Sequence, residues 1–388
     1  MLIRWFVLWF QTVTAAVVTY NLGTTVLPGT VSYENLRYAV DRWNTENTAH
    51  TEVALRVTSP SHPGAFEERL CEVVQHGVVA LIIAPGLSYL DDSLVKSMCH
   101  HFQIPCLSIQ SKNEKDVVSD FVSFVGPSRG LASLATSQFL DSLRWASFLL
   151  AYQHDSDLEE LSPLIYARSE GDLLQKRPSI RIRRLPRNTR DFEPFLKYIR
   201  TRLKQTNIII HSNNITTLYN LLQQARGLNM TEAPYSYIFT HTDLSLLEDF
   251  LNNMQGQFHC NITGLQLVKN DPMMKTELAL TSEATTIIGT ALHRLQEIGT
   301  SPRPASLLCD AKDAWRDGRS LNSALRKLNL KRQLTGDISF DPTGSREDLS
   351  FYGIGRINSQ FVKVSRVTRK VSPRQETVVC VPEFKKQG

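Results

Sequence analysis

The chain has 388 residues, of which 42% are hydrophobic and 21% are charged, and its formal net charge is +5. This length allows two lobes of ordinary size, and the composition is that of a globular protein, which excludes an intrinsically disordered chain. The positive charge is mild and gathers in short clusters at 181–187 and 363–374. Without one long basic face, we expect neither nucleic-acid nor lipid binding.

The first segment has the order of a secretory leader. Residues 1–4 carry a positive charge, residues 5–10 are continuously apolar, and small residues follow at 13–16. This order favours a signal peptide over residues 1–16, cleaved near Ala16, rather than a first buried strand at 5–10. After the leader no apolar run is long enough to cross a bilayer, so we expect the chain as given to be lumenal or extracellular.

From residue 17 to 125 the patterns of strand and helix alternate. Leu36, Val40 and Trp43 follow the spacing of an amphipathic helix, and the unbroken apolar run 78–84 indicates a strand covered on both faces. Gly77 is placed to end a helix in the left-handed conformation. Repeated units of this kind predict a parallel sheet flanked by helices. We expect strands at 17–21, 53–57, 78–84 and 104–109, and helices at 33–44, 66–74 and 90–102.

A second cycle of the same kind begins at 121–125. Alternating Ile and Arg indicate a half-exposed strand at 180–185, and Pro163 predicts an interrupted helix. We expect strands at 146–152, 180–185, 207–211, 235–240 and 263–268, and helices at 131–143, 158–168, 191–203 and 215–225. The last part predicts a long helix at 277–298, a loop at 299–318, a short helix at 321–328, and strands within 334–341, 349–357 and 361–364.

Two segments resemble one known family. The first is 235–244 (YSYIFTHTDL) with 261–264 (NITG), and the second is 334–346 (LTGDISFDPTGSR). Both are similar to segments of the amino-terminal domain of ionotropic glutamate receptors, most closely the kainate type. The similarity extends, with gaps, over residues 17–366.

The resemblance implies an α/β fold of two lobes, a clamshell like the type I periplasmic binding proteins, in which each lobe is a mostly parallel sheet flanked by helices. Lobe 1 would comprise 17–125 plus 275–330, and lobe 2 would comprise 126–270 plus 331–366. Between Val268 and Glu277 the chain is shorter than in kainate receptors, where a further helix intervenes. Residues 367–388 would form a loose basic tail, and its end at 377–383 resembles the first strand of the ligand-binding domain that follows in full-length receptors.

The resemblance also implies a function without chemistry. The domain would pair with related receptor subunits as homo- or heterodimers through lobe 1, contact extracellular synaptic proteins, and lie at the cell surface or postsynaptic membrane. The channel portion would be absent from this chain, and we expect no cofactor. The expected dimer face is the pair of helices that carry Phe66, Leu70, Val73, Leu94, Met98 and Phe102. The alternative is that these apolar side chains face only their own sheet.

Six cysteines are too few for a disulfide-built scaffold, and their spacing leaves 15 complete pairings open. The resemblance implies a bridge between Cys71 and Cys309. Cys99 and Cys106 are most simply interpreted as buried thiols, and the sequence leaves the pairing of Cys99, Cys106, Cys260 and Cys380 open. Glycosylation sequons begin at Asn214, Asn229 and Asn261, in agreement with a secretory route.

Two other functions compete with subunit pairing. In an amino-acid-sensing clamshell, Ser88 in the turn 84–89 and Tyr152, His154 and Asp155 after a lobe 2 strand would line the cleft. Ser88 is better explained as a helix cap. In an enzyme, Cys99 beside His100 and His101 would be nucleophile and base, but no third orienting residue is evident, so we expect no catalysis and no metal site.

Overall fold

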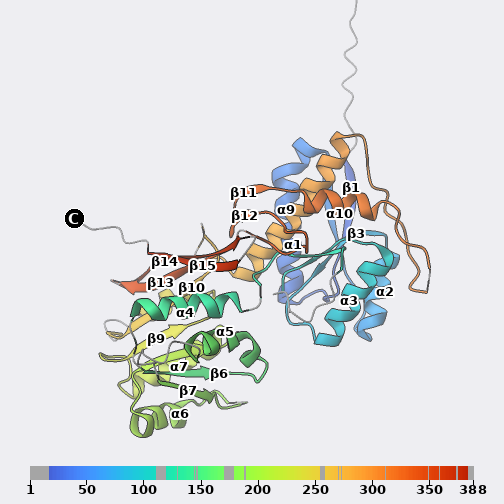
Figure 1. Ribbon diagram of the computed structural model, residues 1–388. Coiled ribbons are helices and arrows are strands. Elements are labelled where there is room, and N and C mark those ends of the chain that lie inside the picture. Colours follow the sequence, from blue (N-terminus) through green and yellow to red (C-terminus); the bar gives the residue numbers. More distant parts are fainter. Residues whose placement is uncertain are drawn as a thin grey trace, which may run out of the picture.

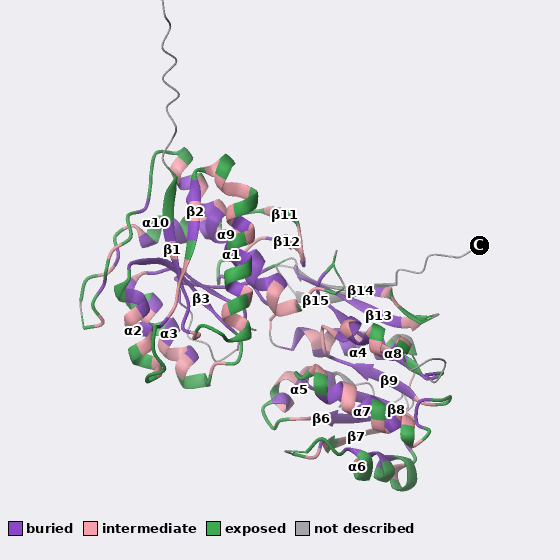
Figure 2. Ribbon diagram, turned by 180° about the vertical axis from the view of Figure 1, so that it is seen from behind, coloured by how far each residue is buried: buried purple, intermediate pink, exposed green. Residues whose placement is uncertain are grey.

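The computed structural model describes residues 17–382 apart from 111–118, 129, 144, 146, 170–178, 188, 254–257, 270, 272, 311, 348, 358 and 373–374, and for 142, 167–169, 179 and 367–382 it describes the backbone alone. The chain forms two α/β lobes joined by several crossing segments (Figure 1). Buried residues occupy the sheets and the inward faces of the helices in both lobes (Figure 2). The expected signal peptide at 1–16 lies outside the described residues.

The first lobe is a five-stranded parallel sheet in the order β2-β1-β3-β4-β5. Every residue of the central strand β3 is buried, because helices cover both faces of the sheet. The strands are β1 (Val18–Gly23), β2 (Val53–Thr58), β3 (Val78–Ile83), β4 (Cys106–Ser108) and β5 (Val122–Phe124). The helices are α1 (Val31–Thr51), α2 (Phe66–Gln75), α3 (Tyr89–Phe102), α9 (Thr276–Glu297) and α10 (Gly318–Arg326).

Local signals set the ends of these helices. The Thr30 hydroxyl caps α1 by accepting the N–H of Tyr33, and the Ser88 hydroxyl caps α3 by accepting the N–H of Asp91. After α2 the chain turns at Gly77, whose φ of +69° favours glycine. The predicted boundaries of these elements are confirmed to within a few residues, except that α1 continues to Thr51.

Helices α1 and α9 pack closely because α9 has a glycine at the contact. A Cβ added to Gly289 would lie 2.3 Å from two ring atoms of the buried Trp43. We expect Gly289→Ala to destabilise the protein by about 1–3 kcal/mol, since the strain of overpacking exceeds the helix propensity that alanine gains. Denaturant unfolding would measure this. Gly227→Ala at the end of α7 is the control, because nothing lies within 4 Å of its added Cβ, and equal losses in the two variants would contradict the argument.

The second lobe is an eight-stranded sheet in the order β15-β14-β13-β10-β9-β8-β6-β7. Strands β6 to β10 are parallel, and β13 pairs antiparallel with β10 and starts an antiparallel edge. The strands are β6 (Ser147–Tyr152), β7 (Ser179–Arg184), β8 (Asn207–His211), β9 (Ser236–Phe239), β10 (Asn261–Gln266), β13 (Ser350–Ile357), β14 (Gln360–Ser372) and β15 (Gln375–Pro382). The helices are α4 (Leu131–Leu143), α5 (Asp157–Ser169), α6 (Glu193–Tyr198) with a π-helical turn Ile199–Leu203, α7 (Ile215–Gly227), a 3-10 turn Leu244–Leu247, and α8 (Glu248–Asn253).

Several expectations for the later elements were wrong. Helix α5 continues through Pro163 instead of being interrupted. The region expected as a loose tail instead pairs along β14 and β15, because this hairpin continues the antiparallel edge that β13 begins. A short strand β11 (Leu330–Gln333), not predicted, pairs with β12 (Gly336–Ile338). The buried cluster around the first sheet extends to Ile338 and Leu349 and also to Leu265 and Phe351 of the second sheet, so it crosses the expected boundary between the lobes without deciding where that boundary lies.

Candidate functional site

Polar side chains gather where the parallel strands of the second lobe end, which is where ligands bind in many open α/β folds. At the end of β8, Nδ1 of His211 lies 2.8 Å from Oγ1 of Thr240, and both side chains are buried. The hydroxyl of Ser212 donates to Oε1 of Gln153, after β6, at 2.5 Å. These contacts join the ends of three neighbouring strands into one polar layer.

The same layer continues into the first lobe. Oδ1 of Asp243 accepts the N–H of Thr276 at 2.9 Å and its hydroxyl at 2.5 Å, which fixes the start of α9. Burial lowers the pKa of His241 although the Asp243 carboxylate acts in the opposite direction. His241 accordingly stays neutral at pH 7, and its Nδ1 accepts the N–H of Asp243 at 3.0 Å. These residues therefore hold the two lobes together.

None of His211, Ser212, Thr240 and Asp243 was predicted from the sequence as a site residue. A signal was present, because each lies at or just after the end of a buried apolar strand. The resemblance of 235–244 to a strand-to-helix turn does not show where its polar side chains meet the neighbouring strands.

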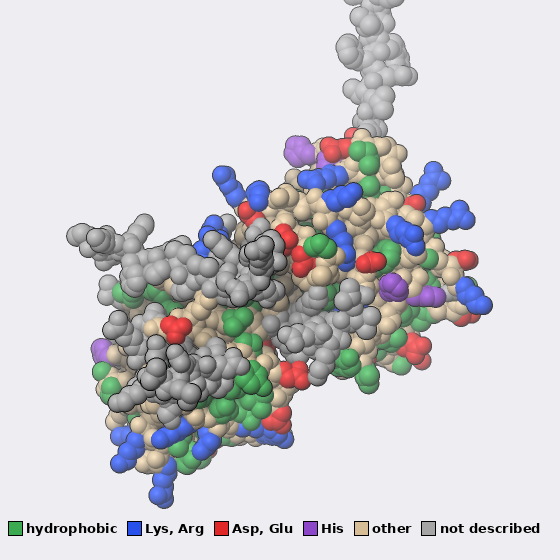
Figure 3. All heavy atoms as spheres, viewed as in Figure 1, with side chains coloured by type: hydrophobic (Ala, Val, Ile, Leu, Met, Phe, Trp, Pro, Cys, Tyr) green, Lys and Arg blue, Asp and Glu red, His purple; other side chains and the backbone are tan. Residues whose placement is uncertain are grey.

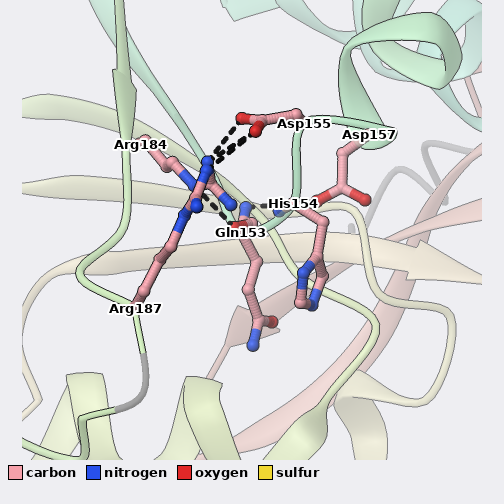
Figure 4. A network of polar contacts seen from close by, with 6 residues as sticks. All are labelled: Gln153, His154, Asp155, Asp157, Arg184 and Arg187. Carbon is pink, nitrogen blue, oxygen red and sulfur yellow. Dashed lines mark hydrogen bonds and ion pairs between the residues drawn. The ribbon is translucent and has the colours of Figure 1, made fainter.

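The loop after β6 directs its carboxylates to different partners. Oδ2 of the buried Asp157 accepts the N–H groups of Gln153 and His154 at 3.1 and 2.7 Å, which closes the turn before α5. Asp155 points outward to Arg184 and Arg187, while the side chains of Gln153 and His154 point the other way (Figure 4). Within the part of the chain that the structure describes, no group of His, Cys, Asp and Glu is arranged to hold a metal ion.

A cavity of about 530 Å³ opens beside this loop, within the second lobe. It lies between the residues that follow β6 and β7 and the first turns of α7. His154 is the one predicted ligand residue that lines it. The lining residues are Gln153, His154, Arg184, Leu185, Pro186, Arg187, Thr189, Arg190, Phe192, Asn214, Thr216, Thr217 and Asn220.

The predicted cleft residues are thus divided. Tyr152 ends β6 and His154 and Asp155 follow it in the second lobe, whereas Ser88 belongs to the first lobe. The Ser88 hydroxyl accepts the N–H of Asp91 at 3.1 Å and donates to its carboxylate at 2.8 Å. Both hydrogen bonds belong to the cap of α3, so the structure uses Ser88 as a helix cap.

Two disulfides lie in the first lobe. One joins Cys71 on α2 to Cys309 in the loop after α9, with Cα atoms 5.5 Å apart, which is the pair that the resemblance implies. The other joins Cys99 to Cys106, so the expectation that these are free thiols was wrong. The last turn of α3 returns directly to β4 and brings their Cα atoms within 6.2 Å. Because Cys99 is bonded to Cys106, it has no free thiol to act as the nucleophile beside His100 and His101.

Cys260 is a buried free thiol, and burial raises its pKa to about 12.

The expected dimer face is only partly exposed. Leu70, Val73 and Phe102 have at most 1% of their surface exposed and pack in the core of their own lobe. These three side chains cannot contact a partner subunit. For them the alternative was correct, namely that they face only their own sheet. Phe66, Leu94 and Met98 are partly buried and remain at the surface of α2 and α3.

The side chains of Asn214, Asn229 and Asn261 are exposed. Asn214 is the N-cap of α7, and its Oδ1 accepts the N–H of Thr216 at 2.9 Å. Oligosaccharyltransferase requires an accessible Asn amide, and all three positions satisfy that condition.

Among the described residues, no helix combines the length and apolar character needed to cross a bilayer.

The chain is similar to known receptor proteins. Residues 31–356 match the family described as the receptor family ligand binding region. The chain is 29% identical over 309 residues to the human protein "Glutamate receptor ionotropic, kainate 4", which covers 72% of this chain and 31% of that protein. It is 25% identical over 364 residues to human "Glutamate receptor ionotropic, kainate 1", which covers 86% of this chain and 36% of that protein. The chain therefore spans about a third of the length of these relatives.

Proposed function

This chain belongs to the receptor family ligand-binding region, and on that premise we propose that it is the extracellular amino-terminal domain of a kainate-type ionotropic glutamate receptor subunit. The observation that carries the proposal is the extent of the similarity: kainate receptor subunits align with 72–86% of the chain. A disulfide and three exposed sequons suit an oxidising, secretory environment. The proposal assigns the domain no catalysis and no cofactor.

We further propose that the domain pairs with related subunits through α2 and α3 of the first lobe. Leu90, Leu94 and Met98 follow each other at intervals of four residues on α3, so they form one apolar stripe. Leu90 is 77% exposed and its neighbour Tyr89 is 59% exposed, although both are large and apolar. Phe66 of the neighbouring helix α2 is partly buried, like Leu94 and Met98. Large exposed apolar side chains such as Leu90 and Tyr89 are typical of a protein interface when they lie together.

The test is sedimentation equilibrium of the secreted, glycosylated chain, alone and with L-glutamate. We expect a dimer whose dissociation constant does not change with glutamate. The double variant Leu90→Glu and Leu94→Glu should weaken it by more than about a hundredfold, because two carboxylates would be desolvated at the interface. Ile298→Glu is the matched control, since Ile298 is 73% exposed but follows α9. A monomer whose stability responds to glutamate would instead support an amino-acid-sensing clamshell.

A further inference from the structure

The cavity in the second lobe has a strongly one-sided charge. Its titratable lining residues are His154, Arg184, Arg187 and Arg190, and none of the described residues that line it is acidic. Basic side chains also gather on the surface at that end of the lobe, over β7 and α6 (Figure 3). A volume of about 530 Å³ lies in the range of pockets that hold small molecules.

The three arginines differ in how far their guanidinium groups are already occupied. Nη1 of Arg184 donates to both carboxylate oxygens of Asp155 at 2.7 and 2.6 Å, and Nη2 of Arg187 donates to Oδ2 at 2.8 Å (Figure 4). One exposed carboxylate therefore serves two guanidinium groups. Arg190 is exposed, and its side chain has no hydrogen-bond or ion-pair partner among the described residues. Donors remain available on all three, since each guanidinium has five N–H groups.

The opposite wall of the cavity is the start of α7. Asn214, Thr216, Thr217 and Asn220 line it, and the first turn of this helix contains no acidic residue. The positive end of the helix dipole therefore faces the cavity without a carboxylate of its own to balance it. The hydroxyl and amide groups of this wall add hydrogen-bonding groups opposite the arginines.

We propose that this cavity binds a small multivalent oxyanion, such as a di- or tricarboxylate or a phosphate ester. Planar guanidinium groups recognise carboxylate and phosphate oxygens by paired hydrogen bonds. The ligand carries no ammonium group, because no acidic side chain lines the cavity to receive one. Asp155 occupies Arg184 and Arg187 in the free protein and competes with the ligand for them. The site lies within one lobe, away from α2 and α3, so it stands apart from the proposed pairing of subunits.

The test is isothermal titration calorimetry of the full chain with citrate and, separately, with inorganic phosphate, at constant ionic strength. We expect saturable binding at one site per chain, and the tighter probe identifies carboxylate or phosphate as the preferred group. Arg190→Gln should weaken binding about tenfold, the effect of losing one charge-assisted contact. Asp155→Asn should tighten it severalfold, because the competing carboxylate is gone.

Arg202→Gln is the matched control, because Arg202 is an exposed arginine on the π-helical turn that does not line the cavity. It removes the same charge from the same lobe and should leave binding unchanged. Three results would overturn the proposal: no saturable binding of either probe, equal weakening by the Arg190 and Arg202 variants, or weaker binding after Asp155→Asn. Circular dichroism of each variant would establish that the lobe is folded.

Asn214 lines the cavity and also begins a sequon, so a glycan at this position could block the cavity. The protein is therefore titrated both with full and with enzymatically trimmed N-glycans.

Discussion

Replacing Glu283 by Gln is expected to lower the free energy of unfolding by about 3–5 kcal/mol, because it leaves the buried guanidinium of Arg346 without a counter-ion. The two side chains are 1% and 0% exposed, and Nη1 of Arg346 lies 2.7 Å from Oε2 of Glu283. The same carboxylate accepts the N–H and the hydroxyl of Thr335, both at 2.7 Å. Glutamine can keep some of these hydrogen bonds but not the charge.

The pair matters for the architecture because of the segments that it joins. Glu283 lies on α9, whereas Arg346 lies in the turn between β12 and β13, where the chain passes to the second lobe. Arg346 also donates to the carbonyl of Asp337 at 3.0 Å and lies 3.5 Å from the carbonyl of Val125, near the first crossing. One buried ion pair thus ties three parts of the chain together near the junction of the lobes.

Equilibrium unfolding in urea would measure this loss. Glu46→Gln on α1 is the matched control, since its ion pair with Arg42 has a similar length of 2.8 Å but side chains that are 39% and 56% exposed. We expect it to cost less than about 1 kcal/mol. The double variant Glu283→Leu with Arg346→Met should recover much of the stability, because it leaves no unpaired charge. Similar losses from Glu283→Gln and Glu46→Gln would rule out this role for the buried pair.

Removing the disulfide between Cys71 and Cys309 is expected to cost about 2–5 kcal/mol. The bridge joins residues 238 positions apart, so it restricts the unfolded chain far more than a short loop would. It also fixes the long loop after α9 against α2, where Ser306 donates to the carbonyl of Gln75 at 2.6 Å. Thermal unfolding of the variant with both residues changed to Ser would measure the effect.

The second disulfide provides the comparison. Cys99 and Cys106 are only 7 residues apart, so in the chain-entropy account their bridge restricts the unfolded state much less. Changing both to Ser should cost less than the loss of the long-range bridge. If the two double variants lost equal stability, loop length would not be the source of the stabilisation. Peptide mapping without reduction would identify both bridges directly.

The sequence predicted the elements well where local chemistry decides them. The cap at Ser88, the left-handed turn at Gly77 and the apolar run 78–84 each depend on a few neighbouring residues, so their positions could be predicted without the fold. The segments 235–244 and 334–346 indicated the family for a related reason, because a run of residues can be compared with a known run without knowledge of the fold.

Tertiary structure decided what depends on distant partners. Helical spacing showed that α2 and α3 each have an apolar face, but only packing determined that Leu70, Val73 and Phe102 lie inside while Leu90 and Leu94 remain near the surface. The bond between Cys99 and Cys106 depends on how α3 meets β4, and the strands of the expected tail depend on the free edge of β13.

The sequence by itself thus determined most of the strands and helices as far as β10, several helix ends such as the cap at Ser88, and the family, because short-range sterics and hydrogen bonds encode them. Only the tertiary structure brought Arg184, Arg187 and Arg190 around one cavity and placed Glu283 against Arg346. The physical reason is that charge complementarity and burial act between residues that are close in space. In this chain Glu283 and Arg346 are 63 positions apart.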